Sequence, residues 1–187
     1  MLLFINACVR DDSRTEELAR YLLSGTNDIV QEIRLCEQTF PAADQSFLDK
    51  RNELISKECF SDPLFTAANQ FASAVTVVIA APYWDLSFPA ALKQYFEQIN
   101  VIGITFTYSC EGMPVGLCCA RKLYYITTAG GRIVSEEYGY GYVKALAGYF
   151  YKIPEIYQIK AEGLDIYGAD ICKLMDQAKR SIDDLLK

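Results

Sequence analysis

The chain contains no histidine. Catalysis by a Ser–His or Cys–His pair is therefore excluded, because both need an imidazole base. Zinc sites of the mixed Cys/His kind are poorly supported as well, because their histidine ligands are missing. The seven cysteines include no C-x-x-C, and their only adjacent pair is Cys118-Cys119. In a chain without a secretion signal, this pattern predicts free thiols in a reducing compartment and no metal site.

Excess basic charge and long apolar runs are missing too. A net charge of −6 argues against a broad nucleic-acid surface, which needs a basic face. No apolar run reaches the ~20 residues of a membrane helix. Residues 1–12 lack the charged start of a signal peptide. The 187 residues, 51% of them apolar, therefore predict one cytoplasmic domain over 1–187, with no nucleic-acid or membrane partner.

Two glycine-rich phosphate motifs are also missing. The sequence holds neither G-x-x-x-x-G-K-[ST] nor G-x-G-x-x-G. Their absence argues against a nucleoside triphosphate, and against a dinucleotide held in a Rossmann turn.

Apolar runs alternate with amphipathic segments along the chain, which predicts an α/β doubly wound parallel sheet with helices on both faces. Five strands favour the flavodoxin-like order 2-1-3-4-5. A turn-prone stretch around 100–120 predicts a small hairpin outside the sheet. We expect strands at 1–7, 28–35, 75–80, 121–128 and 155–161, and helices at 13–23, 45–56, 62–74, 88–99, 138–151 and 169–186.

The loop after the third strand is the most informative segment. The strand itself is almost entirely apolar and rich in β-branched residues, as expected when both faces are covered. The only tryptophan lies on the loop that follows. A rigid turn with an aromatic wall, at the carboxyl end of a parallel strand, suits a flat and partly polar ligand. The alternative is that the aromatic rings only cap the core. The loop residues are Pro82, Tyr83, Trp84, Asp85 and Leu86.

The loop after the first strand leads into a helix N-terminus, where free backbone N–H groups favour an anion. Its candidate phosphate ligands are Arg10, Ser13 and Thr15, with Arg14 as a second cation. A plain helix cap explains the loop equally well, because Ser13-x-x-Glu16 is a capping box. The neighbouring Asp11 and Asp12 would oppose a phosphate.

The loop after the fourth strand contains Thr128, Ala129, Gly130 and Gly131. Paired glycines let a backbone approach a ligand closely, although a tight turn would also require them. In the 2-1-3-4-5 order this loop meets the other two at one sheet edge. Together the three loops predict a cofactor site.

These segments resemble the flavodoxin-like NAD(P)H oxidoreductases that bind FMN, in particular the FMN-dependent azoreductase and quinone reductase family. The resemblance covers most of the chain. Its motifs are Ser13-Arg14-Thr15, the loop 82–86, residues 89–97 (PAALKQYFE), residues 103–108 (GITFTY), the turn 128–131 and residues 161–164 (AEGL).

The resemblance implies that the three loops bind FMN. NADH or NADPH would reduce the flavin, and a quinone, azo compound or similar flat acceptor would then be reduced by a ping-pong mechanism. No side chain would serve as a catalytic acid or base, in agreement with the missing histidine. A homodimer is also implied. The Tyr-rich segment 138–151 suits such an interface, or a helix packed on the core.

Two positions depart from the family pattern. Asp85 stands where the family usually has Asn, and Arg132 follows the glycine pair, where it would favour an acceptor carrying a carboxylate or sulfonate. Two other functions stay open at this point. One is a non-catalytic electron carrier of the flavodoxin type, and the other is a flavin-free protein-binding module.

Overall fold

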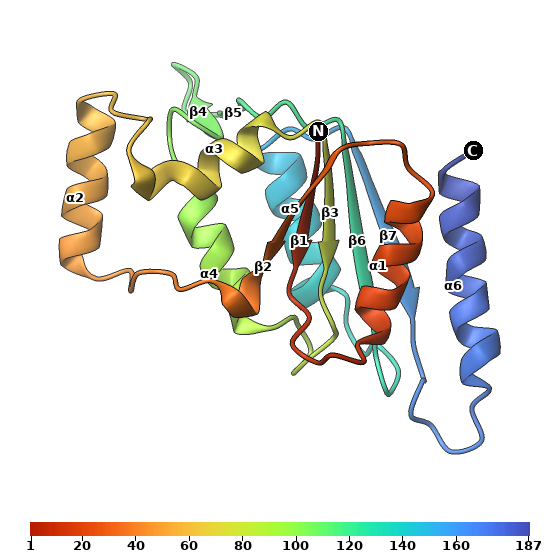
Figure 1. Cartoon of the computed structure of the whole chain (residues 1–187). Coiled ribbons are helices and arrows are strands. Elements are labelled where there is room, and N and C mark those ends of the chain that lie inside the picture. Colours follow the sequence, from red (N-terminus) through yellow and green to blue (C-terminus); the bar gives the residue numbers. More distant parts are fainter.

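The computed structural model describes residues 1–187 as a five-stranded parallel sheet with helices on both faces (Figure 1). The strand order is β2-β1-β3-β6-β7. This agrees with the predicted 2-1-3-4-5 order, since β4 and β5 belong to a separate hairpin. The sheet strands are β1 (Leu2–Asn6), β2 (Val30–Arg34), β3 (Thr76–Ala80), β6 (Lys122–Thr128) and β7 (Glu155–Ala161).

Five helices form the two layers. Helices α1 (Arg14–Ser24) and α6 (Ile171–Leu185) pack on one face of the sheet. Helices α3 (Thr66–Ser73), α4 (Ala90–Ile99) and α5 (Tyr142–Tyr149) pack on the other. A sixth helix, α2 (Gln45–Ser56), stands away from the sheet (Figure 1).

The core lies on both sides of the central strands. In β1, Leu3 and Ile5 face one core, whereas Leu2 and Phe4 face the other. All five residues of β1 are buried. Because neither face meets solvent, the strand reads as a continuous apolar run instead of alternating.

Two predicted helices have irregular first turns. The segment predicted at 62–74 begins with a 3₁₀ turn, Pro63–Phe65, capped by Asp62, whose Oδ1 accepts the Leu64 N–H at 2.9 Å. The Tyr-rich helix begins with a π-helical turn, Glu137–Gly141. There the Gly141 N–H donates to Glu136 O, five residues back, at 2.7 Å. Two glycines in five residues weaken the ordinary α-helical alternative.

The predicted excursion is an antiparallel hairpin of β4 (Phe106–Tyr108) and β5 (Pro114–Gly116). Phe106 anchors it through an edge-on contact with Phe150, with ring centroids 4.8 Å apart. Gly112 supplies the positive φ of 76° that the tip requires. None of the helices combines the length and the apolarity that crossing a membrane would take.

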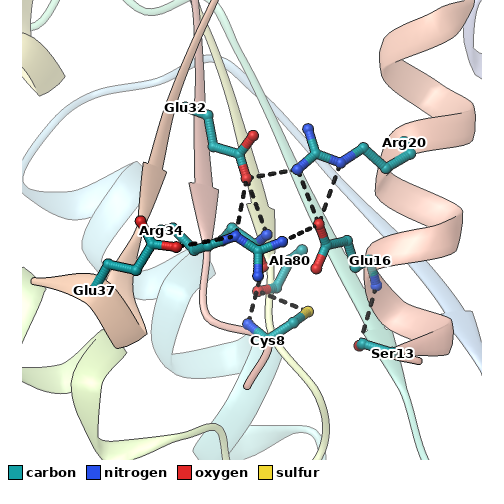
Figure 2. Close-up of polar contacts among 9 residues, drawn as sticks. Cys8, Ser13, Glu16, Arg20, Glu32, Arg34, Glu37 and Ala80 are labelled. Carbon is teal, nitrogen blue, oxygen red and sulfur yellow. Dashed lines mark hydrogen bonds and ion pairs between the residues drawn. The ribbon is translucent and has the colours of Figure 1, made fainter. Parts of the chain in front are cut away.

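A partly exposed charge cluster joins α1 to β2 (Figure 2). We call Glu16, Arg20, Glu32 and Arg34 the Glu16 cluster. Glu16 Oε1 accepts from both arginines, with Arg20 Nη2 at 2.9 Å. Arg20 Nη2 also donates to Glu32 Oε1 at 2.7 Å. The cluster therefore fixes the first turn of α1 against the edge strand.

Glu16 is not the capping-box partner that the sequence predicts. Its own N–H donates to Ser13 Oγ at 3.3 Å, so half of the box forms. The carboxylate, however, is bound by the two arginines and does not return to the Ser13 N–H. The Glu16 carboxylate binds the arginines and not the Ser13 N–H, because a charged donor makes a stronger hydrogen bond to a carboxylate than a neutral amide does.

We expect Ile79→Ala on β3 to lower the free energy of unfolding by about 2–5 kcal/mol, because Ile79 is fully buried between sheet and helices. The matched control is Ile29→Ala, at a side chain that is 82% exposed; it should change stability by less than about 0.5 kcal/mol. Urea unfolding measures both. Equal losses for the two variants would contradict the assigned core.

We expect Glu16→Gln to lower the free energy of unfolding at neutral pH by about 1–3 kcal/mol. Burial favours the neutral carboxyl, but the hydrogen bond from Arg20 and the positive charges of Arg34 and Arg20 outweigh it and hold the Glu16 pKa below its ordinary 4.5. A lowered folded-state pKa contributes stability above pH 4.5, and this contribution is lost as pH falls through the folded-state value.

The difference between wild type and Glu16→Gln should therefore shrink during acid titration below pH 4.5. The control Glu53→Gln removes an exposed pair with Lys57 and should leave stability almost unchanged. A pH-independent difference for Glu16→Gln would show that its ionisation does not stabilise the fold.

Candidate functional site

A cavity of about 300 Å³ opens at the carboxyl edge of the sheet. The loops after β1, β3, β6 and β7 line it. Of the residues that the sequence predicts for a cofactor site, nine line this cavity: Arg10, Ser13, Thr15, Pro82, Tyr83, Trp84, Thr128, Ala129 and Gly130. Three do not: Asp85, Leu86 and Gly131.

Strand register brings these loops together. Asn6 of β1 pairs with Ala80 of β3, and Ala80 pairs with Ile126 of β6. Backbone hydrogen bonds continue past the strands, from Ala7 N–H to Ala80 O at 2.8 Å and from Tyr83 N–H to Thr128 O at 3.0 Å. The loops that follow β1, β3 and β6 therefore leave the sheet side by side at its carboxyl edge and line one cavity.

The first loop presents a row of free backbone donors. The Cys8 N–H donates to Asn6 Oδ1 and the Glu16 N–H to Ser13 Oγ, but the N–H groups of residues 9–15 donate to no protein acceptor. The row ends on the N-terminus of α1. Consecutive free N–H groups and the positive end of a helix dipole together form an anion-binding site.

Side chains of both charge signs surround this row. Arg10, Asp12, Arg14 and Asp165 all line the cavity. Arg14 Nη1 and Asp165 Oδ1 form an ion pair at 2.8 Å that joins α1 to the loop after β7. Thr15 is fully buried, and its hydroxyl lies 2.6 Å from Thr128 Oγ1. The first loop is therefore tied to two others by side chains.

The loop after β3 turns on two residues in the left-handed region, with φ of 50° at Asp85 and 67° at Leu86. Trp84 and Ser87 close this turn by exchanging backbone hydrogen bonds of 3.1 and 2.7 Å. Positive φ suits Asp but is strained for Leu. The turn keeps Trp84 on the cavity wall and carries Asp85 and Leu86 to the tip. Asp85 and Leu86 therefore do not line this cavity, and their role in cofactor binding stays a prediction.

Gly130 lacks a side chain because Asp165 fills that space. A Cβ on Gly130 would lie 3.0 Å from Asp165 Cγ and closer still to its Oδ2, whereas a Cβ on Gly131 would meet nothing within 4 Å. Gly131 lies on the exposed side of the turn, which explains its absence from the cavity lining. The close approach predicted at this glycine pair is therefore made at Gly130, by a protein carboxylate.

Sequence reasoning missed four lining residues or gave them no binding role: Val9, Asp12, Leu164 and Asp165. The AEGL motif that contains Leu164 was the available signal for the loop after β7. Arg132 lies exposed on its loop and does not line the cavity.

No activated nucleophile accompanies the site. Cys8 lies fully buried beneath the first loop, with its Sγ 3.9 Å from Ala80 O. Burial raises the pKa of the Cys8 thiol to about 11, so the thiol is neutral at physiological pH. The arrangement can bind an anion and a flat group, and it has no side chain prepared for covalent catalysis.

A smaller cavity of about 10 Å³ lies behind Tyr83, which lines both cavities. The buried hydroxyls of Tyr125 and Thr127 line this second space and have no protein hydrogen-bond partner. Its size suits one water molecule, which would satisfy both hydroxyls.

The parallel sheet, its strand order and a cavity at the carboxyl edge define a flavodoxin-like α/β protein. The chain belongs to the family described as flavodoxin-like fold, whose sequence profile matches residues 1–185.

Curated relatives carry the name FMN-dependent NADH:quinone oxidoreductase. The one from Clostridium beijerinckii is 40% identical over 125 residues, covering 66% of this chain and 62% of the relative. That alignment spans less than two thirds of the relative's length. The one from Coprothermobacter proteolyticus is 31% identical over 187 residues, covering 95% of this chain and 92% of the relative.

Solved structures show the same fold. An azoreductase from Bacillus anthracis superimposes with a TM-score of 0.83 at 23% identity, covering 99% of this chain and 97% of the other. A FMN-dependent NADH-azoreductase from the same species, solved in complex with FMN, gives a TM-score of 0.82 at 22% identity, covering 99% and 96%.

We expect Gly130→Ala to lower the free energy of unfolding by about 1 kcal/mol, because the new Cβ must displace the Asp165 side chain. Gly131→Ala is the matched control and should be neutral, since its Cβ meets open space. Urea unfolding compares the two, and a crystal structure of Gly130→Ala should lack the Arg14–Asp165 pair. Equal stability of both variants, with the pair intact, would contradict this explanation.

Proposed function

We propose that this chain is a FMN-dependent oxidoreductase that takes hydride from NADH or NADPH and passes electrons to a quinone, an azo compound or a similar flat acceptor. One observation carries the proposal. The free N–H row of residues 9–15 shares a single cavity with an aromatic wall and a Gly-containing turn. The relatives named as FMN-dependent NADH:quinone oxidoreductases support it.

The residues present fit the phosphate of FMN. The N–H row and the α1 N-terminus provide donors, and Ser13 and Thr15 also line the cavity, although the Thr15 hydroxyl is paired with that of Thr128. Arg10 supplies a positive charge that has no ion-pair partner in the chain. An anion with several acceptor oxygens matches this donor set better than a neutral ligand does.

The remaining walls fit a flat ring system. Tyr83 and Trp84 form one side, and the backbone at Thr128, Ala129 and Gly130 forms another. Trp84 is 39% exposed, so its ring is available for contact. We propose that these residues hold the isoalloxazine ring, as the sequence predicts.

Bound FMN would supply the hydride chemistry, and the protein would bind, orient and shield the reactants. No side chain of the cavity is required as a catalytic acid or base. The nicotinamide and the acceptor would use the same face of the bound flavin in turn. This arrangement predicts ping-pong kinetics.

We further propose that residues 1–187 form one domain and that the active form is a homodimer. The two cores share a single sheet, which supports one domain. Exposed apolar side chains on the cavity wall and on nearby segments support a covering partner: Val9, Trp84, Leu86, Val134 and Tyr138. In the Tyr-rich segment, Tyr138 and Tyr149 are exposed, whereas Tyr151 is buried and donates to Asn100 Oδ1 at 2.7 Å. Only part of this segment is therefore free for an interface.

The test is an anaerobic spectral titration of the purified chain with FMN, followed by NADH or NADPH. We expect bound flavin whose absorbance bleaches on addition of a nicotinamide and returns on addition of a quinone. Flavin that binds but ignores both nicotinamides would show an electron carrier instead. A chain that never binds FMN would contradict the proposal at its first step.

A further inference from the structure

The Arg14–Asp165 ion pair has no evident role in stability. The side chains are 37% and 68% exposed, and such surface pairs contribute between about 0 and 1 kcal/mol. Both residues nevertheless line the cavity, and Arg14 itself belongs to the free N–H row. The pair therefore lies where the proposed function places the phosphate of FMN.

Asp165 is held in place by its backbone and by its neighbours. Its N–H donates to Gly130 O at 2.8 Å, and the N–H groups of Gly163 and Leu164 donate to Gly131 O and Ala129 O at 2.8 and 3.2 Å. Position 130 has no Cβ that would push the carboxylate away. The loop after β7 is thus fastened to the loop after β6, with the Asp165 carboxylate directed to Arg14.

Arg14 is the oriented cation of the site. One of its five N–H donors is used by Asp165, through Nη1. Arg10, in contrast, makes no ion pair or side-chain hydrogen bond with the protein. An arginine already held by a carboxylate loses less side-chain entropy when it binds a phosphate than a free one does.

We propose that Asp165 is a positioning residue for phosphate recognition: it holds the Arg14 guanidinium at the cavity so that the remaining donors bind the phosphate of FMN. This inference rests on the proposed function. A carboxylate near a phosphate is otherwise expected only to repel it and to weaken its binding. Asp12 provides that comparison, since it lines the same cavity and has no ion-pair or side-chain partner.

The experiment measures dissociation constants of the full-length apoprotein for FMN and for riboflavin, which lacks the phosphate, by quenching of flavin fluorescence. We expect Asp165→Asn to weaken FMN binding about tenfold, equivalent to about 1.4 kcal/mol, and to change riboflavin binding less than about twofold. The matched control Asp12→Asn should leave FMN binding unchanged or strengthen it. Thermal unfolding of each variant checks that it is folded.

A double-mutant cycle with Arg14→Gln sharpens the test. Asp165→Asn should cause no further loss of FMN affinity once Arg14 is gone, because the carboxylate acts through that side chain. Additive losses would overturn the proposal. An equal loss of FMN and riboflavin affinity would also overturn it, since it would show that Asp165 only supports the loop.

Tighter FMN binding by Asp165→Asn would overturn the positioning role, because it is the result expected if the Asp165 carboxylate only repels the phosphate. Failure of the proposed function would give a different result from failure of the positioning role. In that case the wild-type chain itself binds neither flavin, whatever the variants do.

Discussion

The parallel register of β1, β3 and β6 is the constraint on which the rest of the structure depends. Asn6, Ala80 and Ile126 lie side by side in the sheet, so the loops that follow must emerge together. Both faces of these strands are buried, so the central strands meet solvent only near their ends, and the carboxyl ends of parallel strands share one edge. A ligand site at this edge follows from topology before any side chain is considered.

The first loop keeps a row of backbone N–H groups without protein acceptors. A complete capping box would have used the Ser13 N–H, but the arginines of the Glu16 cluster take the Glu16 carboxylate. The same cluster reaches the loop through Asn6, which binds Glu32 Oε1 at 3.1 Å and the Cys8 N–H at 3.0 Å. The loop is therefore fixed from the side, and its donors stay free for a ligand. Leu86 is a second local irregularity at the same edge of the sheet, because its backbone lies in the left-handed region, which is strained for leucine.

Much of this arrangement could be predicted from the sequence. The apolar runs gave the five strands, and the aromatic loop after β3 marked the site, because both signals are local. The role of Asp165 could not be predicted, since it depends on backbone bonds between the loops after β6 and β7. Arg20 is an i,i+4 partner of Glu16 that helix spacing could suggest, but its second partner, Arg34, comes from β2, 18 residues away, where no spacing rule applies. Asp85 and Leu86 lie outside the cavity lining because they form the tip of a tight turn, and the sequence does not show which way such a turn points.

The central claim is that residues 9–15 bind the phosphate of FMN through their backbone N–H groups. Amide chemical shifts of the ¹⁵N-labelled chain, recorded during titration with FMN and then with riboflavin, test it most directly. The account predicts large shifts at residues 9–15 with FMN and much smaller ones there with riboflavin, while residues 82–84 and 128–130 respond to both. Shifts at residues 9–15 of the same size with both ligands, or none with FMN, would contradict it.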